Sequence, residues 1–177
     1  MSRGTEAAFL TAARRDDVDA VVAYTPSAYV WPGQGADGGN PPSWTVDGDP
    51  LPPVPRPDAE VAPAETDDGL RFRPIFEACV DHASADELAA SALPLDDVDA
   101  DVLLVSGRDD GVWHADEMAA TVAERLRDGT AGTVVHRCYD AFGHHAAPPY
   151  VPTTDRTVVT PPDGPPVVHG GTPAGIA

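Results

Sequence analysis

Apolar residues in this chain fall into short blocks separated by proline, glycine and aspartate. Residues 5–13 combine strong helix formers with few polar positions, which predicts a helix buried on all sides. The apolar run 18–24, ended by Thr25-Pro26, predicts a buried strand. A helix followed by a buried strand is typical of an α/β protein with a parallel sheet.

The second half of the chain again alternates predicted helices and strands. Ser84 and Glu87 have the spacing of a capping box, which predicts a helix running to about Ser91. Residues 101–106 contain the continuous apolar run 102–105, so we expect a central strand with both faces covered. Residues 133–139 predict another strand.

The clearest helix is predicted over residues 115–127. Met118, Val122 and Leu126 recur at helical spacing and form one apolar stripe. Acidic residues open this segment, basic residues close it, and Gly129 follows the expected end. This pattern indicates an amphipathic helix that packs on a sheet.

Two regions depart from this pattern. Residues 32–69 are rich in proline, glycine and aspartate and predict a long insertion loop, which in a compact domain has a function or is mobile. Within it, 44–51 predicts a hairpin because Asp47-Gly48 is a favourable turn pair. Residues 156–177 show no periodicity and are expected to form a poorly structured tail.

The composition narrows the classes of partner. The 177 residues fit one domain, and the formal charge is −18, with 29 acidic residues against 11 basic ones. Such acidity argues against binding to nucleic acid or to an anionic membrane, because phosphates would be repelled. All the basic residues are arginine. We therefore expect a halophilic protein from a salt-rich cytoplasm, where salt screens this charge.

Cysteine usage and hydropathy point to the same compartment. Cys79 and Cys138 are too few for a disulfide framework and fit a reducing environment. Neither opens a predicted helix, so neither is favoured as a nucleophile. There is no 18-residue apolar run and no signal-peptide pattern, so we expect a cytoplasmic protein without membrane association.

The candidate chemistry begins at the amino end. Ser2-Arg3-Gly4, directly before the first predicted helix, has the form of the second half of a G-x-S-x-G nucleophile elbow. Such a turn exposes the serine hydroxyl. We expect glycine at position 4 because the Cβ of any other residue would clash with the turn. The helix N-terminus would direct free N–H groups at an oxyanion. The simpler alternative is a serine that only caps a helix.

An acid and a base follow at the ends of the two later strands. Asp109-Asp110 ends one predicted strand and His144 follows the next, where parallel sheets gather their ligands. The order Ser2, Asp110, His144 is that of α/β-hydrolases, in which histidine activates serine and a carboxylate orients the histidine. Spacing favours Asp110 over Asp109. Trp113 is a candidate for lining the pocket. Alternatively, the two aspartates form only a turn, and the histidine is a loop residue without a catalytic role.

A metal site is the competing interpretation. Potential ligands lie close together near the second strand: His136, Cys138, Asp140, His144 and His145. Zinc uses such side chains, but the spacing matches no C-x-x-C or H-E-x-x-H pattern. We therefore expect no metal and no cofactor.

Several stretches of the sequence occur together in one known family. They are the blocks 2–6, 21–31, 43–52, 102–113, 143–150 and 169–173. The strongest are Ser-Gly-Arg-Asp-Asp-Gly-Val-Trp within 102–113 and Gly-His-His-Ala-Ala-Pro-Pro-Tyr at 143–150. On these blocks the chain resembles the C-terminal catalytic domain of the acyl-CoA thioesterase and bile-acid-CoA:amino acid N-acyltransferase family.

The resemblance implies an α/β-hydrolase fold over residues 1–155 and an acyl-CoA substrate. Carried over, Ser2 is the nucleophile that forms an acyl-enzyme, Asp110 the acid and His144 the base, and the backbone N–H of Arg3 is an oxyanion donor. Family members with cysteine as nucleophile pass the acyl group to an amino acid. Serine is expected to favour water.

The resemblance also implies what lies outside this stretch. Family members have an amino-terminal β-sandwich, strands before the elbow and a closing helix. We therefore expect a partial α/β-hydrolase fold, truncated at both ends, in which the C-terminal half of a mostly parallel sheet exposes an unpaired edge and apolar surface. A missing N-terminal segment or a complementary chain would complete it. The alternatives are an inactive fragment, or an ester or lactone hydrolase of the dienelactone-hydrolase kind.

Overall fold

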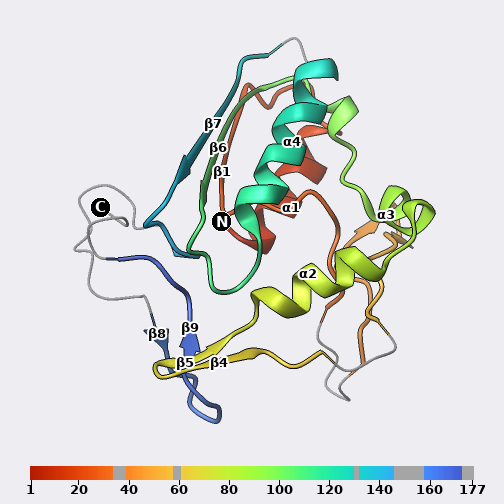
Figure 1. Ribbon diagram of the computed structural model, residues 1–177. Coiled ribbons are helices and arrows are strands. Elements are labelled where there is room, and N and C mark those ends of the chain that lie inside the picture. The colour runs from red at the N-terminus through yellow and green to blue at the C-terminus, as the bar shows by residue number, and fades with distance from the viewer. Residues whose placement is uncertain (34–38, 58–60, 130–131, 146–157, 173–177) are drawn as a thin grey trace.

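The fold is built around a three-stranded parallel sheet, seen edge-on in Figure 1. The computed structural model describes residues 1–33, 39–57, 61–129, 132–145 and 158–172. The strands are β1 (Ala20–Tyr24), β6 (Asp101–Gly107) and β7 (Val134–Tyr139), in the order β1-β6-β7. The prediction that the strand beginning at residue 101 is central is confirmed. The chain thus has the α/β fold expected from its sequence.

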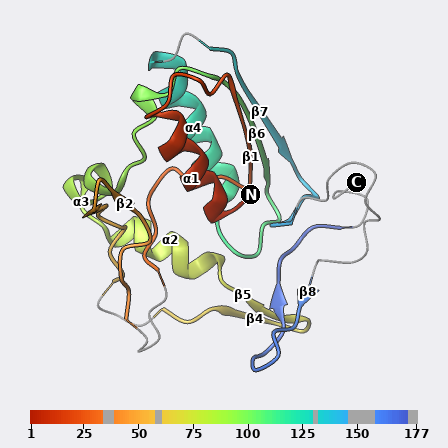
Figure 2. The same ribbon diagram turned by 180° about the vertical axis from the view of Figure 1, so that it is seen from behind.

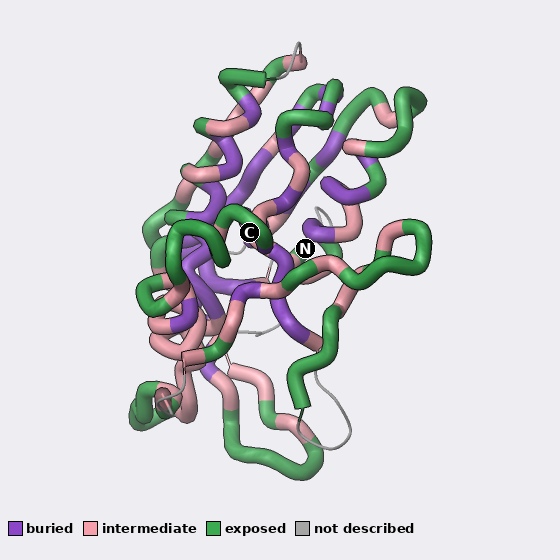
Figure 3. Tube along the Cα trace, turned by 90° about the vertical axis from the view of Figure 1, so that its right-hand side faces the viewer, coloured by how far each residue is buried: buried purple, intermediate pink, exposed green. Residues whose placement is uncertain are grey.

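Helices α1 (Arg3–Ala12) and α4 (Ala115–Gly129) lie on the same face of this sheet, as Figures 1 and 2 show from opposite sides. The stripe of Met118, Val122 and Leu126 is buried against it, as predicted. The helix continues through Gly129 instead of ending before it. In Figure 3 the buried trace is concentrated where strands and helices face each other.

The other face of the sheet is only partly covered within the described residues. Side chains alternate along β1, so Val21 and Ala23 are buried while Val22 is 53 % exposed. Val22, Leu103 and Val135 are paired in register across the three strands and share this face. The prediction of a buried strand over 18–24 therefore holds for only one face of β1.

Helix α1 is also less enclosed than its composition predicts. Its buried residues include Phe9 and Leu10, but Thr11 and Gly4 are exposed. A groove of about 360 Å³ runs between α1 and β1, lined by small side chains such as Ala7 and Ala8. A Cβ on Gly4 would meet no described atom within 4 Å, so the expected clash is absent. The groove is the reason: it leaves that side of the turn open.

A layer of short helices lies beside the sheet. Helix α3 (Ala85–Ser91) begins at Ser84 with the predicted capping box, and a 3-10 turn, η1, spans Leu95–Asp97. Helix α2 (Arg73–His82) was not predicted. A proline in its first turn and apolar residues at helical spacing were the available signals, but the helix lies directly after the proline-rich region.

The long insertion and the tail both contain regular structure. The predicted hairpin is present as β2 (Thr45–Val46) and β3 (Asp49–Pro50). A second sheet joins strands from both regions in the order β4-β5-β9-β8. Its strands are β4 (Ala64–Thr66), β5 (Gly69–Arg71), β8 (Val158–Val159) and β9 (Val167–Val168). Contrary to the expected unstructured tail, residues 158–172 are therefore partly ordered, because β9 pairs with β5.

Candidate active site

Ser2 lies at the N-terminus of α1 in a backbone conformation that few non-glycine residues adopt. Its φ of 53° and ψ of −136° place it in a strained turn. The Ser2 N–H donates to the carbonyl of Tyr24 at 3.1 Å, so the end of β1 holds this turn. Its side chain makes no capping hydrogen bond to the helix. Instead, the hydroxyl points at an imidazole.

A continuous hydrogen-bonded chain joins Ser2, His144 and Asp110. Ser2 Oγ lies 3.0 Å from His144 Nε2, and His144 Nδ1 lies 2.9 Å from Asp110 Oδ2. Since a carboxylate only accepts, Nδ1 carries the proton and Nε2 is free to accept from the serine. Asp110 is fully buried and His144 is 5 % exposed. The structure thus brings together three residues that are 34 and 142 positions apart along the chain.

The two neighbouring aspartates have different surroundings. Asp110 Oδ1 accepts the backbone N–H groups of Val112 and Trp113, at 2.8 and 3.1 Å, which orients the carboxylate towards His144. Asp109 points elsewhere: it pairs with Arg71 at 2.9 Å and accepts the N–H of Gly171 at 2.7 Å. Of these two aspartates, only Asp110 contacts the imidazole of His144.

Aromatic rings pack behind the histidine. Trp113 meets the His144 ring edge-on at a centroid distance of 5.4 Å, and is itself 1 % exposed. Trp31 stacks on Trp113 at 6.4 Å, and Phe76 packs edge-on against both indoles. Trp113, expected to line a pocket, therefore forms a buried wall that restricts the His144 ring.

The N-terminus of α1 is the place where the sequence predicts an oxyanion donor, the backbone N–H of Arg3. Arg3 is its first residue, and the N–H groups of the first turn lack intrahelical acceptors. Two of the following N–H groups are already used, since Gly4 donates to Met1 and Thr5 to Ser2. The Arg3 side chain turns away from the triad and binds Ser43 and the carbonyls of Trp31 and Pro32.

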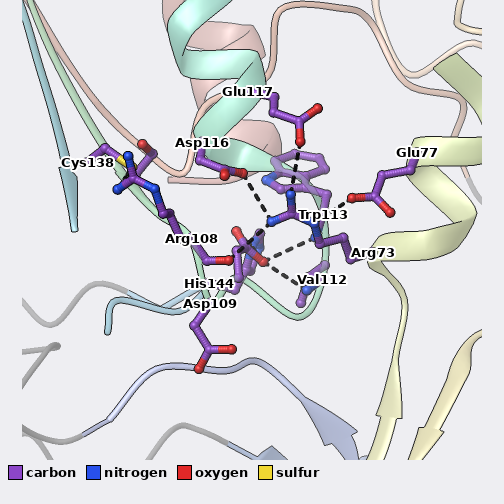
Figure 4. Close-up of polar contacts among 12 residues, drawn as sticks. Arg73, Glu77, Arg108, Asp109, Val112, Trp113, Asp116, Glu117, Cys138 and His144 are labelled. Carbon is purple, nitrogen blue, oxygen red and sulfur yellow. Dashed lines mark hydrogen bonds and ion pairs between the residues drawn. The ribbon is translucent and has the colours of Figure 1, made fainter. Parts of the chain in front are cut away.

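Arg73 anchors the loop that carries Asp110 through the contacts that Figure 4 shows. Its guanidinium contacts Glu77 at 2.6 Å, Asp116 at 3.1 Å and Glu117 at 3.2 Å, and also the carbonyl of Arg108. These contacts join α2 to both ends of the loop between β6 and α4. Sequence reasoning missed this residue, because Asp116 and Glu117, the partners that connect it to α4, are distant in the chain.

The side chains considered as metal ligands are used in other ways. His136 Nε2 lies 2.8 Å from Ser106 Oγ, while Cys138 and Asp140 contact Arg108 at 3.3 and 3.0 Å. In the part of the chain that the structure describes, no group of three or more His, Cys, Asp or Glu is arranged to hold a metal ion.

Glu6 is a buried carboxyl that the sequence did not single out. It is fully buried on α1, where its Oε2 accepts the indole N–H of Trp44 at 2.8 Å and the backbone N–H of Trp31 at 3.3 Å. Burial raises the pKa of Glu6 to about 7, and the two hydrogen bonds and the nearby Arg3 only partly oppose this. Glu6 thus connects α1 to the loop that carries Trp31.

The raised pKa of Glu6 makes the stability depend on pH. The folded protein holds this proton up to about pH 7, while the unfolded chain releases it near 4.5, so stability falls as pH rises between these values. The expected loss is about 3 kcal/mol. Denaturant unfolding at pH 5 and pH 8 should show that E6Q reduces this difference, while E65Q, at an exposed position, does not. An equal pH dependence of E6Q and the parent protein would contradict this assignment.

Comparison with known proteins identifies the family of this chain. No helix among the described residues is both long enough and apolar enough to cross a membrane. No curated protein matches the chain. The family described as BAAT / Acyl-CoA thioester hydrolase C terminal matches residues 1–176, which is nearly the whole chain. The chain therefore belongs to the BAAT / acyl-CoA thioester hydrolase C-terminal family.

Proposed function

We propose that this domain hydrolyses acyl-CoA thioesters through an acyl-enzyme on Ser2. The observation that carries the proposal is the hydrogen-bonded chain from Ser2 Oγ through the His144 ring to the buried Asp110. Family membership supports the substrate class, since the family is named for acyl-CoA thioester hydrolysis. The strained φ of Ser2 supports its role as nucleophile, because strain of this kind gathers at functional sites.

In the first half of the reaction, Ser2 Oγ attacks the thioester carbonyl carbon as His144 Nε2 takes the hydroxyl proton. Asp110 stabilises the imidazolium that forms and keeps the ring oriented. The tetrahedral intermediate then collapses, the bond from carbon to sulfur breaks, and His144 returns the proton to the departing thiolate. The products of this half are free CoA and an ester on Ser2.

Water completes the cycle. His144 accepts a proton from a water molecule, which attacks the ester carbonyl, and the proton then passes to Ser2 Oγ as the carboxylic acid leaves. In both halves the developing oxyanion faces the N-terminus of α1, where the Arg3 N–H and the helix dipole offer stabilisation.

Turnover of acyl-CoA by the purified chain tests the proposal. We expect release of free thiol, measured with a thiol reagent, and an acyl adduct on Ser2 detected by intact-protein and peptide mass spectrometry. Turnover of p-nitrophenyl esters or lactones without turnover of acyl-CoA would favour an ester or lactone hydrolase instead. Absence of both turnover and adduct formation would contradict the proposal and favour an inactive domain.

A further inference from the structure

One backbone carbonyl near the carboxyl end joins the two loops of the proposed triad. His169 O accepts the N–H of Gly111 at 3.2 Å and the N–H of His144 at 2.8 Å. Gly111 directly follows Asp110, so this single acceptor connects the acid loop to the loop that carries the base. A shift of His169 would therefore move both loops relative to each other.

The residues after His169 are held tightly between the same loops. Gly170 has a φ of +73°, and a Cβ there would overlap the carbonyl of Asp109. A Cβ on Gly143 would overlap the carbonyl of Gly170 in turn. Gly171 donates to the carboxylate of Asp109 at 2.7 Å. Without side chains at these glycines, the segment fits between the loops, and its position is closely determined.

The imidazole of His169 also contacts the proposed base. Its ring lies edge-on to His144 at a centroid distance of 5.6 Å and stacks on His145 at 4.3 Å, with the planes only 3° apart. Its Nδ1 is buried and has no hydrogen-bond partner among the described residues. Burial, and to a smaller extent the adjacent His145 and His144, lower the pKa of His169 to about 4. The ring is therefore neutral at neutral pH.

A neutral ring is the kind of neighbour that a general base requires. When His144 takes the proton from Ser2 it becomes a cation, and a second cation in contact would disfavour that state. An aromatic ring instead restricts the orientation of His144, as Trp113 also does, without opposing its charge. Packing of this kind keeps Nε2 aligned with the serine hydroxyl.

We propose that His169 is a positioning residue of this site: its ring supports His144, and its carbonyl joins the loops of Asp110 and His144. The proposal rests on the proposed function. It assigns a role to the carboxyl-terminal segment, which pairs with the second sheet through β9 and so links that sheet to the triad. His169 touches no reacting atom in this role.

Two measurements on three variants test the proposal. The first is the rate at which a fluorophosphonate probe labels Ser2, as a function of pH. The second is the low-field proton NMR resonance of the His144–Asp110 hydrogen bond, which requires no activity. H169A removes the ring, H169F keeps an aromatic ring of similar size, and H82A, at the exposed end of α2, is the control for loss of a histidine.

We expect H169A to lower the labelling rate about 10-fold or more and to broaden or shift the low-field resonance, with H169F and H82A close to the parent protein. H169Q replaces H169A if the latter does not fold by circular dichroism. Unchanged labelling and an unchanged resonance in H169A would overturn the proposal, as would equal losses in H169F and H169A. If the parent protein is not labelled, the proposed function fails. The NMR comparison then still tests the positioning role.

Discussion

Replacing Ser2 with alanine is expected to reduce acyl-CoA hydrolysis by about 10⁴-fold or more and to abolish the acyl adduct. The hydroxyl is the only group at this position that His144 Nε2 can activate, and it lies 3.0 Å away. The fold should persist, because the Ser2 side chain makes no capping bond and its backbone contacts with Tyr24 and Thr5 remain. Steady-state kinetics and mass spectrometry provide the measurements.

Ser84 offers a matched control for this substitution. S84A removes another serine at a helix N-terminus, whose side chain accepts the N–H of Glu87. We expect about 1 kcal/mol lower stability from the lost cap and unchanged turnover. Retention of the acyl adduct in S2A would assign the nucleophile to another residue and contradict the proposed mechanism.

Substituting Asp110 with asparagine is expected to have the second large effect, about 10⁴-fold in kcat. The amide oxygen of asparagine can still accept from Val112 and Trp113, so the loop keeps its shape. However, the amide offers an N–H towards His144 Nδ1, which favours the wrong tautomer, and it cannot stabilise the imidazolium. The dependence of kcat on pH measures the change in the base directly.

D109N is the natural comparison, because the two aspartates are adjacent. Asp109 pairs with Arg71 at a partly exposed site, where such a pair contributes at most about 1 kcal/mol. We expect D109N to retain most of its turnover and to lose at most a small part of its stability. Equal losses of kcat in D109N and D110N would show that contact with His144 does not identify the catalytic acid.

Local patterns were enough to predict several elements. The capping box at Ser84 and the apolar stripe from Met118 to Leu126 each depend on residues within a few turns, and both are present. The hairpin at Asp47-Gly48 is likewise a local turn preference. The prediction of a central strand at 101–106 is confirmed because β6 pairs with β1 on one side and with β7 on the other.

Features that depend on long-range contacts were missed or predicted wrongly. Val22 is exposed because no described helix covers its face of the sheet, although its neighbours are as apolar as those of a buried strand. Glu6 has the sequence pattern of an ordinary acidic residue in a first helical turn, yet it is buried by Trp31 and Trp44. Burial of this kind depends on segments about 25 and 38 residues away.

The features of the candidate site likewise fall into those that local sequence predicts and those that depend on long-range contacts. The order Ser2, Asp110, His144 and the α/β alternation were evident from residue types and their spacing, because strand ends and helix starts are local features. Spacing also favoured Asp110 over Asp109 as the acid. The contact of the Asp110 carboxylate with the imidazole, and the place of His169 between both loops, came from the folded chain alone. Parallel strands bring their carboxyl ends to one edge, but which side chain turns inwards there depends on contacts between segments distant in sequence.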